Sequence, residues 1–94
     1  MSQIFWSDLA IADLQDIDDY WSQHSLDVAE RMADRIEHAA AFLVTAPRAG
    51  PAIPDSEARK WGVASTPYLL VYRLKEPAIE ILRIHHGRQN WRDV

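Results

Sequence analysis

Two short runs of apolar residues in the last third of the chain predict a β-hairpin. The runs lie within residues 67–86, are rich in β-branched and aromatic side chains, and are separated by Lys75, Glu76 and Pro77. Such runs around a short, charged connection that contains proline are typical of two antiparallel strands and their turn. Apolar residues occupy both odd and even positions of each run, which favours a central hairpin covered on both faces.

Apolar residues at helical spacing predict a helix that follows a short strand at residues 3–6. Ser7 is a suitable N-cap, and apolar side chains then recur every three or four positions up to Trp21. We expect this helix to end near residues 23–24. The spacing leaves three aspartates for the solvent: Asp13, Asp16 and Asp19.

A longer apolar stripe predicts a second helix that packs against the first. Ser25 is its N-cap, and the stripe runs from Val28 to Leu43 with alanines beside it. Because alanine allows two helices to approach closely, we expect a helical hairpin. Pro47 and Gly50 then end the second helix.

The segment between the second helix and the β-hairpin predicts a loop and one further strand. Prolines and a glycine interrupt residues 47–56, and residues 57–63 favour a strand in spite of their charges. The predicted order is therefore β-α-α-β-β-β. This is an α+β fold in which a helical hairpin packs on a small, mainly antiparallel sheet, and we expect residues 1–94 to form a single domain.

Composition is typical of a globular protein and excludes several classes. Of the 94 residues, 48% are hydrophobic and 26% are charged, which argues against a disordered chain. No apolar run approaches the roughly 18 residues of a membrane span, and the first residues do not resemble a signal peptide. The chain has no cysteine, and its net charge of −4 argues against general nucleic-acid binding. We expect a cytoplasmic protein.

Basic side chains and histidines near the hairpin are the candidates for binding or catalysis: Arg59, Lys60, Arg73, Arg83, His85, His86 and Arg88. His85 and His86 are adjacent, so in a strand they point to opposite faces and cannot hold one metal ion together. The chain has only three glycines, and it carries no signature of a phosphate-binding loop, a dinucleotide site or a serine hydrolase. We therefore expect no metal and no cofactor.

The alternation of side chains along a strand decides whether these arginines and histidines lie on the same face of the sheet. Arg73 has the parity of Val71, whereas Arg83 and His85 have the parity of Ile81. If these parities share one face of the sheet, two arginines and a histidine form an anion site, where His85 could act as a general acid or base. Alternatively, the arginines pair with carboxylates and cover the core with their aliphatic stems. The candidate carboxylates are those of Glu76, Glu80 and the helices.

Residues spread over nearly the whole chain resemble the ParE branch of the RelE/ParE toxin superfamily. The opening strand and helix match at Ile4-Phe5-Trp6-Ser7, Ala10, Asp13-Leu14, Ile17 and Tyr20-Trp21. The second helix matches from Ala29 to Leu43, followed by Pro47 and Gly50 of a "P-x-x-G" motif. The hairpin matches at residues 67–73 and at residues 79–87, and Arg59-Lys60 precedes it. No single motif is highly specific, but their order and spacing together favour this family.

The resemblance implies a toxin of a bacterial type II toxin–antitoxin pair. Such toxins are small cytoplasmic proteins, and each is neutralised by a cognate antitoxin, here one similar to ParD. RelE-like members cut messenger RNA on the ribosome, whereas ParE-like members inhibit DNA gyrase without nuclease chemistry. Neither a membrane nor direct sequence-specific nucleic-acid binding is implied.

The hairpin residues favour the gyrase inhibitor over the ribonuclease. The related ribonucleases often carry an arginine where this chain has Leu69, which can neither neutralise a phosphate nor donate a hydrogen bond. If the chain were a ribonuclease, its catalytic set would be Arg83, His85 and His86, which lacks part of the required base, acid and cations. We therefore expect a protein that acts by binding and has no catalytic residues. A third alternative is a degenerate, non-toxic module that only binds its antitoxin.

Two binding surfaces follow from this hypothesis. The predicted target-binding residues are Arg73, Arg83, His85, Arg88 and Trp91. Large aromatic residues and arginines are enriched at binding hot spots, although Trp91 could equally fold back onto the core. The predicted antitoxin-binding residues are Trp61, Leu69 and Tyr72, for which plain core positions are the alternative.

Overall fold

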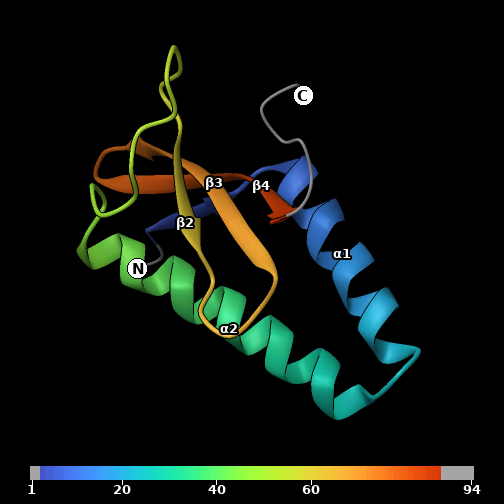
Figure 1. Ribbon diagram of the computed structural model, residues 1–94. Helices are drawn as coiled ribbons and strands as arrows, with labels where there is room; N and C mark the ends of the chain where they lie inside the picture. Colours follow the sequence, from blue (N-terminus) through green and yellow to red (C-terminus); the bar gives the residue numbers. More distant parts are fainter. Residues whose placement is uncertain (1–2, 88–94) are drawn as a thin grey trace.

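The computed structural model describes residues 3–87 and has the predicted β-α-α-β-β-β order (Figure 1). Its elements are β1 (Ile4–Trp6), α1 (Asp8–Ser22), α2 (Leu26–Thr45), β2 (Arg59–Gly62), β3 (Tyr68–Lys75) and β4 (Ala78–His86). The two helices pack on a four-stranded sheet, so the predicted α+β class and helical hairpin are confirmed.

Both predicted N-caps are in place. The Ser7 side-chain oxygen accepts a hydrogen bond from the Ala10 amide at 3.0 Å, and Ser25 accepts one from Val28 at 3.4 Å. Each bond satisfies one of the amide groups that a helix leaves unpaired at its start. The short Gln23–Ser25 connection then turns α2 back along α1, which gives the antiparallel helix pair.

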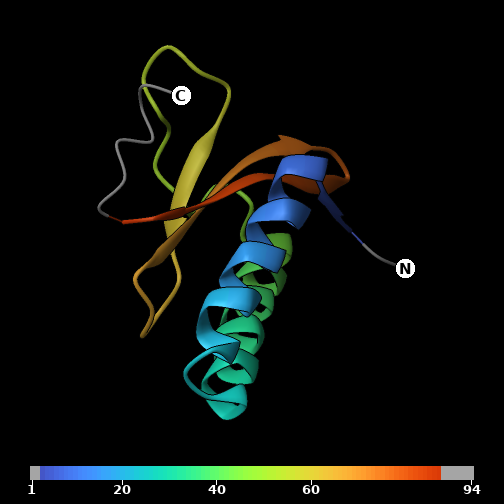
Figure 2. The same cartoon turned by 90° about the vertical axis from the view of Figure 1, so that its right-hand side faces the viewer.

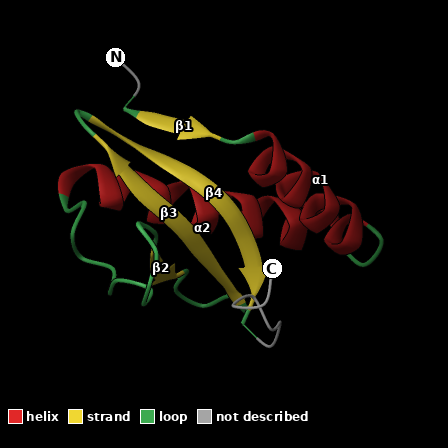
Figure 3. Cartoon of the chain, turned by 90° about the horizontal axis from the view of Figure 1, so that it is seen from above, coloured by secondary structure: helices red, strands yellow, loops and turns green. Residues whose placement is uncertain are grey.

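The sheet has the strand order β1-β4-β3-β2, so the first and last strands of the chain are neighbours. β1 runs parallel to β4, and the other two pairs are antiparallel. Figures 2 and 3 show both helices on the same side of this sheet. The hairpin strands β3 and β4 are the two inner strands, as predicted. The helices cover one face of the hairpin, and on the other face Val71 and His85 are also buried, beside the loop of residues 53–58. We call the side that faces away from the helices the outer face; it carries Leu69, Val71, Arg73, Arg83 and His85.

A β-bulge in β4 decides which side chains reach each face. Val71 pairs with Arg83, but the next residue of β3, Tyr72, pairs with Ile81, so Leu82 is an extra residue in its strand. The bulge reverses the alternation, because Ile81 and Ile84 then both point toward the helices. The prediction that Arg83 shares a face with Ile81 is wrong for this reason. Arg83 and His85 instead lie on the outer face.

The core between the sheet and the helices encloses the hydroxyl of Tyr72, a polar group with two hydrogen-bond partners. This side chain is completely buried. Its hydroxyl donates a hydrogen bond to the Pro47 carbonyl at 2.7 Å and accepts one from the Gly50 amide at 3.0 Å. A Cβ atom at Gly50 would lie 2.4 Å from the Lys60 carbonyl oxygen, so no larger residue fits there. Pro47 and Gly50 thus end α2 and also close the core.

Candidate functional site

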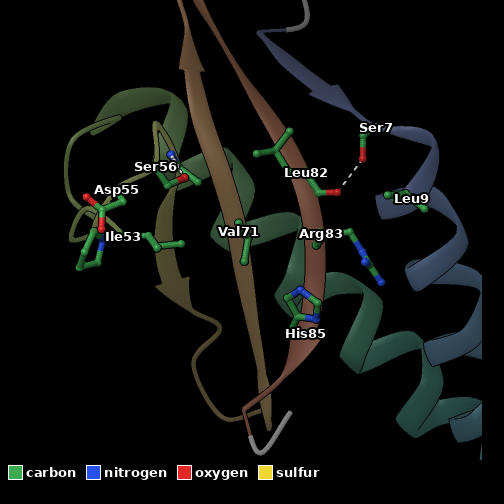
Figure 4. Close-up of a pocket in the computed structure, with 11 residues that line it drawn as sticks. Ser7, Leu9, Ile53, Asp55, Ser56, Val71, Leu82, Arg83 and His85 are labelled. Atoms are coloured by element: carbon green, nitrogen blue, oxygen red, sulfur yellow. Dashed lines mark hydrogen bonds between the residues drawn. The ribbon is translucent and has the colours of Figure 1, made fainter. Parts of the chain in front are cut away.

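A pocket of about 680 Å³ opens on the outer face of the sheet. Val71, Leu82 and His85 form its floor, and the loop of residues 53–58 stands beside it (Figure 4). Leu9, at the start of α1, borders the opposite side. We call this cavity the outer pocket. Its lining is mainly apolar, which is typical of a surface that receives a side chain of a binding partner or of the chain itself.

Ser7 fixes the wall of the outer pocket that belongs to β4. Its hydroxyl donates a hydrogen bond of 2.7 Å to the carbonyl of Leu82, the bulged residue, while also capping α1 (Figure 4). The Ser7 amide donates to the Ile81 carbonyl at 2.9 Å. One residue therefore ties the start of α1 to the bulge, and the position of Leu82 in the pocket depends on it.

Arg83 is held by a carboxylate of α1. Its Nε lies 2.9 Å from Asp13 Oδ2, and its Nη2 lies 3.1 Å from Asp13 Oδ1, which makes a bidentate pair. The Ile84 amide donates to the same carboxylate at 2.8 Å. The hydrogen bonds that Arg83 donates to Asp13 raise the pKa of its guanidinium, which therefore remains charged throughout the physiological range. This charge is matched by that of Asp13.

Asp13 thereby takes a role that its position in the sequence did not reveal. We predicted that it faces solvent, but its side chain is only 14% exposed. Helical spacing alone placed it on the polar side of α1. Its contact with β4 depends on how the helix lies across the strand, which local periodicity does not contain.

Arg73 is also paired, with the neighbouring strand. Its Nε lies 2.6 Å from Glu80 Oε1, and the two residues are register partners in β3 and β4. A second carboxylate, that of Glu57, lies 4.0 Å from its Nη1. Of the two alternatives considered for the arginines, pairing with carboxylates is the one that the structure shows for both Arg73 and Arg83.

The two histidines point to opposite faces, as strand geometry predicted. His85 lines the outer pocket, lies across from Leu69 and is only 4% exposed. His86 is on the helix side, with its ring edge against Tyr68 at a centroid distance of 5.8 Å. Arg83, His85 and His86 are therefore not brought together as a catalytic set. Among residues 3–87, no group of side chains has the composition of a metal site.

The three residues predicted to contact an antitoxin lie in different places. Tyr72 is fully buried, so the core alternative holds for it. Trp61 is on the helix side of β2 and stacks on Phe42 of α2, with ring centroids 5.3 Å apart, beside a pocket of about 490 Å³. Leu69 is half-buried on the outer face. Two of the predicted target-binding residues, Arg88 and Trp91, lie outside the described residues.

Neither helix in the described part of the chain is long and apolar enough to cross a membrane.

This chain is similar to known proteins along nearly its whole length. Toxin RelE2 of Caulobacter vibrioides is 36% identical over 87 residues, which cover 93% of this chain and 97% of that protein. The putative toxin Y4kP of Sinorhizobium fredii is 30% identical over 92 residues, covering 98% of this chain and 95% of that protein. A chain from the structure of a chromosomal ParDE toxin–antitoxin system of P. aeruginosa superposes with a TM-score of 0.78 at 26% identity, covering 92% of this chain and 96% of that one.

The similarity in sequence is thus matched by a similarity in fold. The family described as the ParE toxin of the type II toxin–antitoxin system parDE matches residues 4–91. This chain belongs to the ParE toxin family.

Proposed function

We propose that this toxin acts in the cytoplasm by binding and inhibiting DNA gyrase, and that a cognate ParD-like antitoxin neutralises it. The solved relative from P. aeruginosa comes from a ParDE toxin–antitoxin system, which supports an antitoxin as partner. The match to the ParE family supports a toxin of a type II toxin–antitoxin system. In this proposal Arg73, Arg83 and His85 border the target-binding surface, together with Arg88 and Trp91.

The bidentate pair of Arg83 with Asp13 is the observation that carries this choice. Cleavage of RNA through the 2′-hydroxyl develops negative charge on the phosphate, and cations near the phosphate must stabilise it. A phosphate at the outer pocket would have to compete with a carboxylate that already holds Arg83 at 2.9 and 3.1 Å. Arg73 is similarly held by Glu80, and Leu69 supplies no charge. The described part of the outer face therefore has little cationic charge to offer a phosphate.

Two observations favour the alternative, a ribosome-dependent ribonuclease. Arg83 and His85 both line the outer pocket, and the relative from C. vibrioides is named RelE2. This alternative requires the guanidinium of Arg83 to leave Asp13 when RNA binds. It therefore predicts that His85 and Arg83 act in chemistry, whereas our proposal gives them no chemical role.

A supercoiling assay with purified chain and DNA gyrase tests the proposal directly. We expect the native chain to inhibit supercoiling and Trp91→Ala to be at least tenfold less potent. Circular dichroism should show that His85→Phe keeps the native fold. Primer extension on messenger RNA from expressing cells should show no new ends. Codon-linked cuts that His85→Phe abolishes, together with unaffected gyrase, would establish the ribonuclease instead.

The antitoxin requires its own test. The product of the neighbouring gene, when co-expressed, should restore growth and copurify with the chain. We expect Leu69→Glu and Phe42→Glu to weaken that copurification separately, because the two side chains lie on opposite sides of the sheet and a wrapping partner would contact both. Normal growth on expression of the chain alone would contradict both toxin functions and leave the non-toxic binding module.

A further inference from the structure

A further pocket, of about 490 Å³, lies on the helix side of the sheet, where α1 passes the end of the hairpin remote from its turn. α1 contributes residues three and four positions apart, which share one side of a helix. The ends of β3 and β4 contribute a pair of register partners. Four of the lining side chains are aromatic rings: Tyr20, Trp21, Tyr68 and His86. We call this cavity the aromatic pocket.

The rings of the aromatic pocket stand nearly at right angles in two pairs. The ring centroids of Tyr20 and Trp21 are 5.1 Å apart with planes at 89°, and those of Tyr68 and His86 are 5.8 Å apart with planes at 84°. Trp21 Nε1 donates a hydrogen bond of 2.9 Å to the Tyr68 hydroxyl, which ties the two pairs together. Rings at different angles around a cavity are typical of aromatic cages, which bind organic cations because the faces of the rings are negative.

A carboxylate supplies the charge that a cation needs. Two aspartates of α1 line the aromatic pocket, and the charge of Asp13 is already matched by Arg83. Asp16 is exposed and forms no salt bridge with any side chain of residues 3–87. α1 as a whole carries five aspartates and neither lysine nor arginine. Within the described residues, no lysine or arginine lines this pocket. The pocket is therefore complementary in charge to a cation.

We propose that the aromatic pocket binds an arginine side chain of a different protein. A guanidinium is planar, so it stacks on a ring while its N–H groups reach a carboxylate, which the compact ammonium group of lysine does less well. Tyr20, which is 54% exposed, supplies the ring, and Asp16 supplies the carboxylate. The aromatic pocket and the outer pocket lie on opposite sides of the sheet, so a ligand in one does not block the other. The inference depends on neither gyrase nor an antitoxin.

Nuclear magnetic resonance of the full-length chain with N-acetylarginine methylamide tests the proposal. We expect a saturable shift of the Trp21 indole signal, which is identified by its loss in Trp21→Phe. The indole signal of Trp61, which stacks on Phe42 away from the aromatic pocket, is the reference and should not move. N-acetylcitrulline methylamide has nearly the same shape without the charge, and it should give no saturable shift. Equal shifts with both compounds, or no saturable shift with either, would overturn the proposal.

Substitutions on the exposed side of α1 assign the binding to the aromatic pocket. Asp16→Asn and Tyr20→Ala should each raise the dissociation constant roughly fivefold. Tyr20→Phe keeps the ring, and Asp18→Asn removes an exposed charge outside the pocket, so each should change the constant by about twofold or less. Equal weakening by Asp16→Asn and Asp18→Asn would indicate general attraction to α1 and would overturn the proposal. A Trp21 shift that grows with protein concentration alone would assign the pocket to a second copy of the chain, which would also overturn it.

Discussion

The two faces of the sheet show two ways of burying a strand. The helix-covered face is filled mainly by aliphatic side chains, including Leu70, Ile79 and Ile81, and the buried hydroxyl of Tyr72 makes two hydrogen bonds there. The outer face carries charged residues whose charges are matched in pairs, Arg83 with Asp13 and Arg73 with Glu80. The first face specifies the fold through close packing. The second keeps its charges partly accessible to water, so a partner can compete for them.

This contrast implies a gradient in the cost of substitution. Close-packed positions have no room to adjust, so a change of one methyl group is felt in full. Ion pairs that remain partly exposed are screened by water, and their loss costs less. Substitutions at one position of each kind test whether the two faces differ as described.

The largest effect is expected for Gly50→Ala, next to the helix-covered face. The added methyl group would lie 2.4 Å from the Lys60 carbonyl oxygen and 2.8 Å from the Tyr72 hydroxyl, so backbone must move and the hydrogen bond to Tyr72 is disturbed. We expect the free energy of unfolding in urea to fall by roughly 3 kcal/mol.

Gly62→Ala is the matched control, because a Cβ atom at Gly62 meets nothing within 4 Å. Its free energy of unfolding should be unchanged or higher by about 0.5 kcal/mol. If the two alanine variants were equally stable, the close approach at Gly50 would not limit the fold.

An intermediate effect is expected for Asp13→Asn, where α1 meets the outer face. Asparagine keeps the shape but presents an NH₂ group to one of its present donors, the Arg83 guanidinium or the Ile84 amide. We expect a loss of roughly 2 kcal/mol in urea unfolding. Asp16→Asn, an exposed position on the same helix, should change stability by about 0.5 kcal/mol or less. Asp13→Asn also frees the guanidinium of Arg83. If Asp13→Asn bound RNA measurably and the native chain did not, the ion pair of Arg83 with Asp13 would be shown to suppress RNA binding.

The smallest effect is expected for Arg73→Gln. Its guanidinium lies 2.6 Å from Glu80, but 38% of the side chain is exposed, so solvent screens much of the interaction. We expect a change of about 0.5 kcal/mol in thermal unfolding, reduced further in high salt. If Arg73→Gln lost as much stability as Asp13→Asn, the two ion pairs of the outer face would contribute equally to stability.

The elements themselves were readable from the chain. Ser7 and Ser25 cap the helices as predicted, and the spacing of apolar residues in residues 67–86 gave the hairpin and its turn. These features are local, because a cap or a turn depends on residues only a few positions apart. The strand predicted at residues 57–63 was found as the shorter β2.

The details of the site were not readable, for two physical reasons. The bulge at Leu82 reverses the alternation of β4, and no residue type marks it. Arg83 and His85 therefore have the parity of Ile81 in the sequence but lie on the opposite face, together with Arg73. The pairing of Asp13 with Arg83 joins positions 70 residues apart, and it follows from the crossing of α1 over β4. The bulge and this ion pair both depend on tertiary packing, so neither leaves a periodic pattern in the sequence.

The position of β1 beside β4 has a consequence for synthesis of the protein on the ribosome. β1 and α1 are made before the other described elements, yet their bonds to the sheet, such as Ser7 to Leu82 across 75 residues, need β4, the last of them. A nascent chain can form its helical hairpin early, because that pair of elements is local. It cannot complete the sheet until translation has passed His86. A fragment that stops short of β4 therefore contains neither the outer pocket nor the ion pair of Arg83, and the sheet forms only after β4 has been translated.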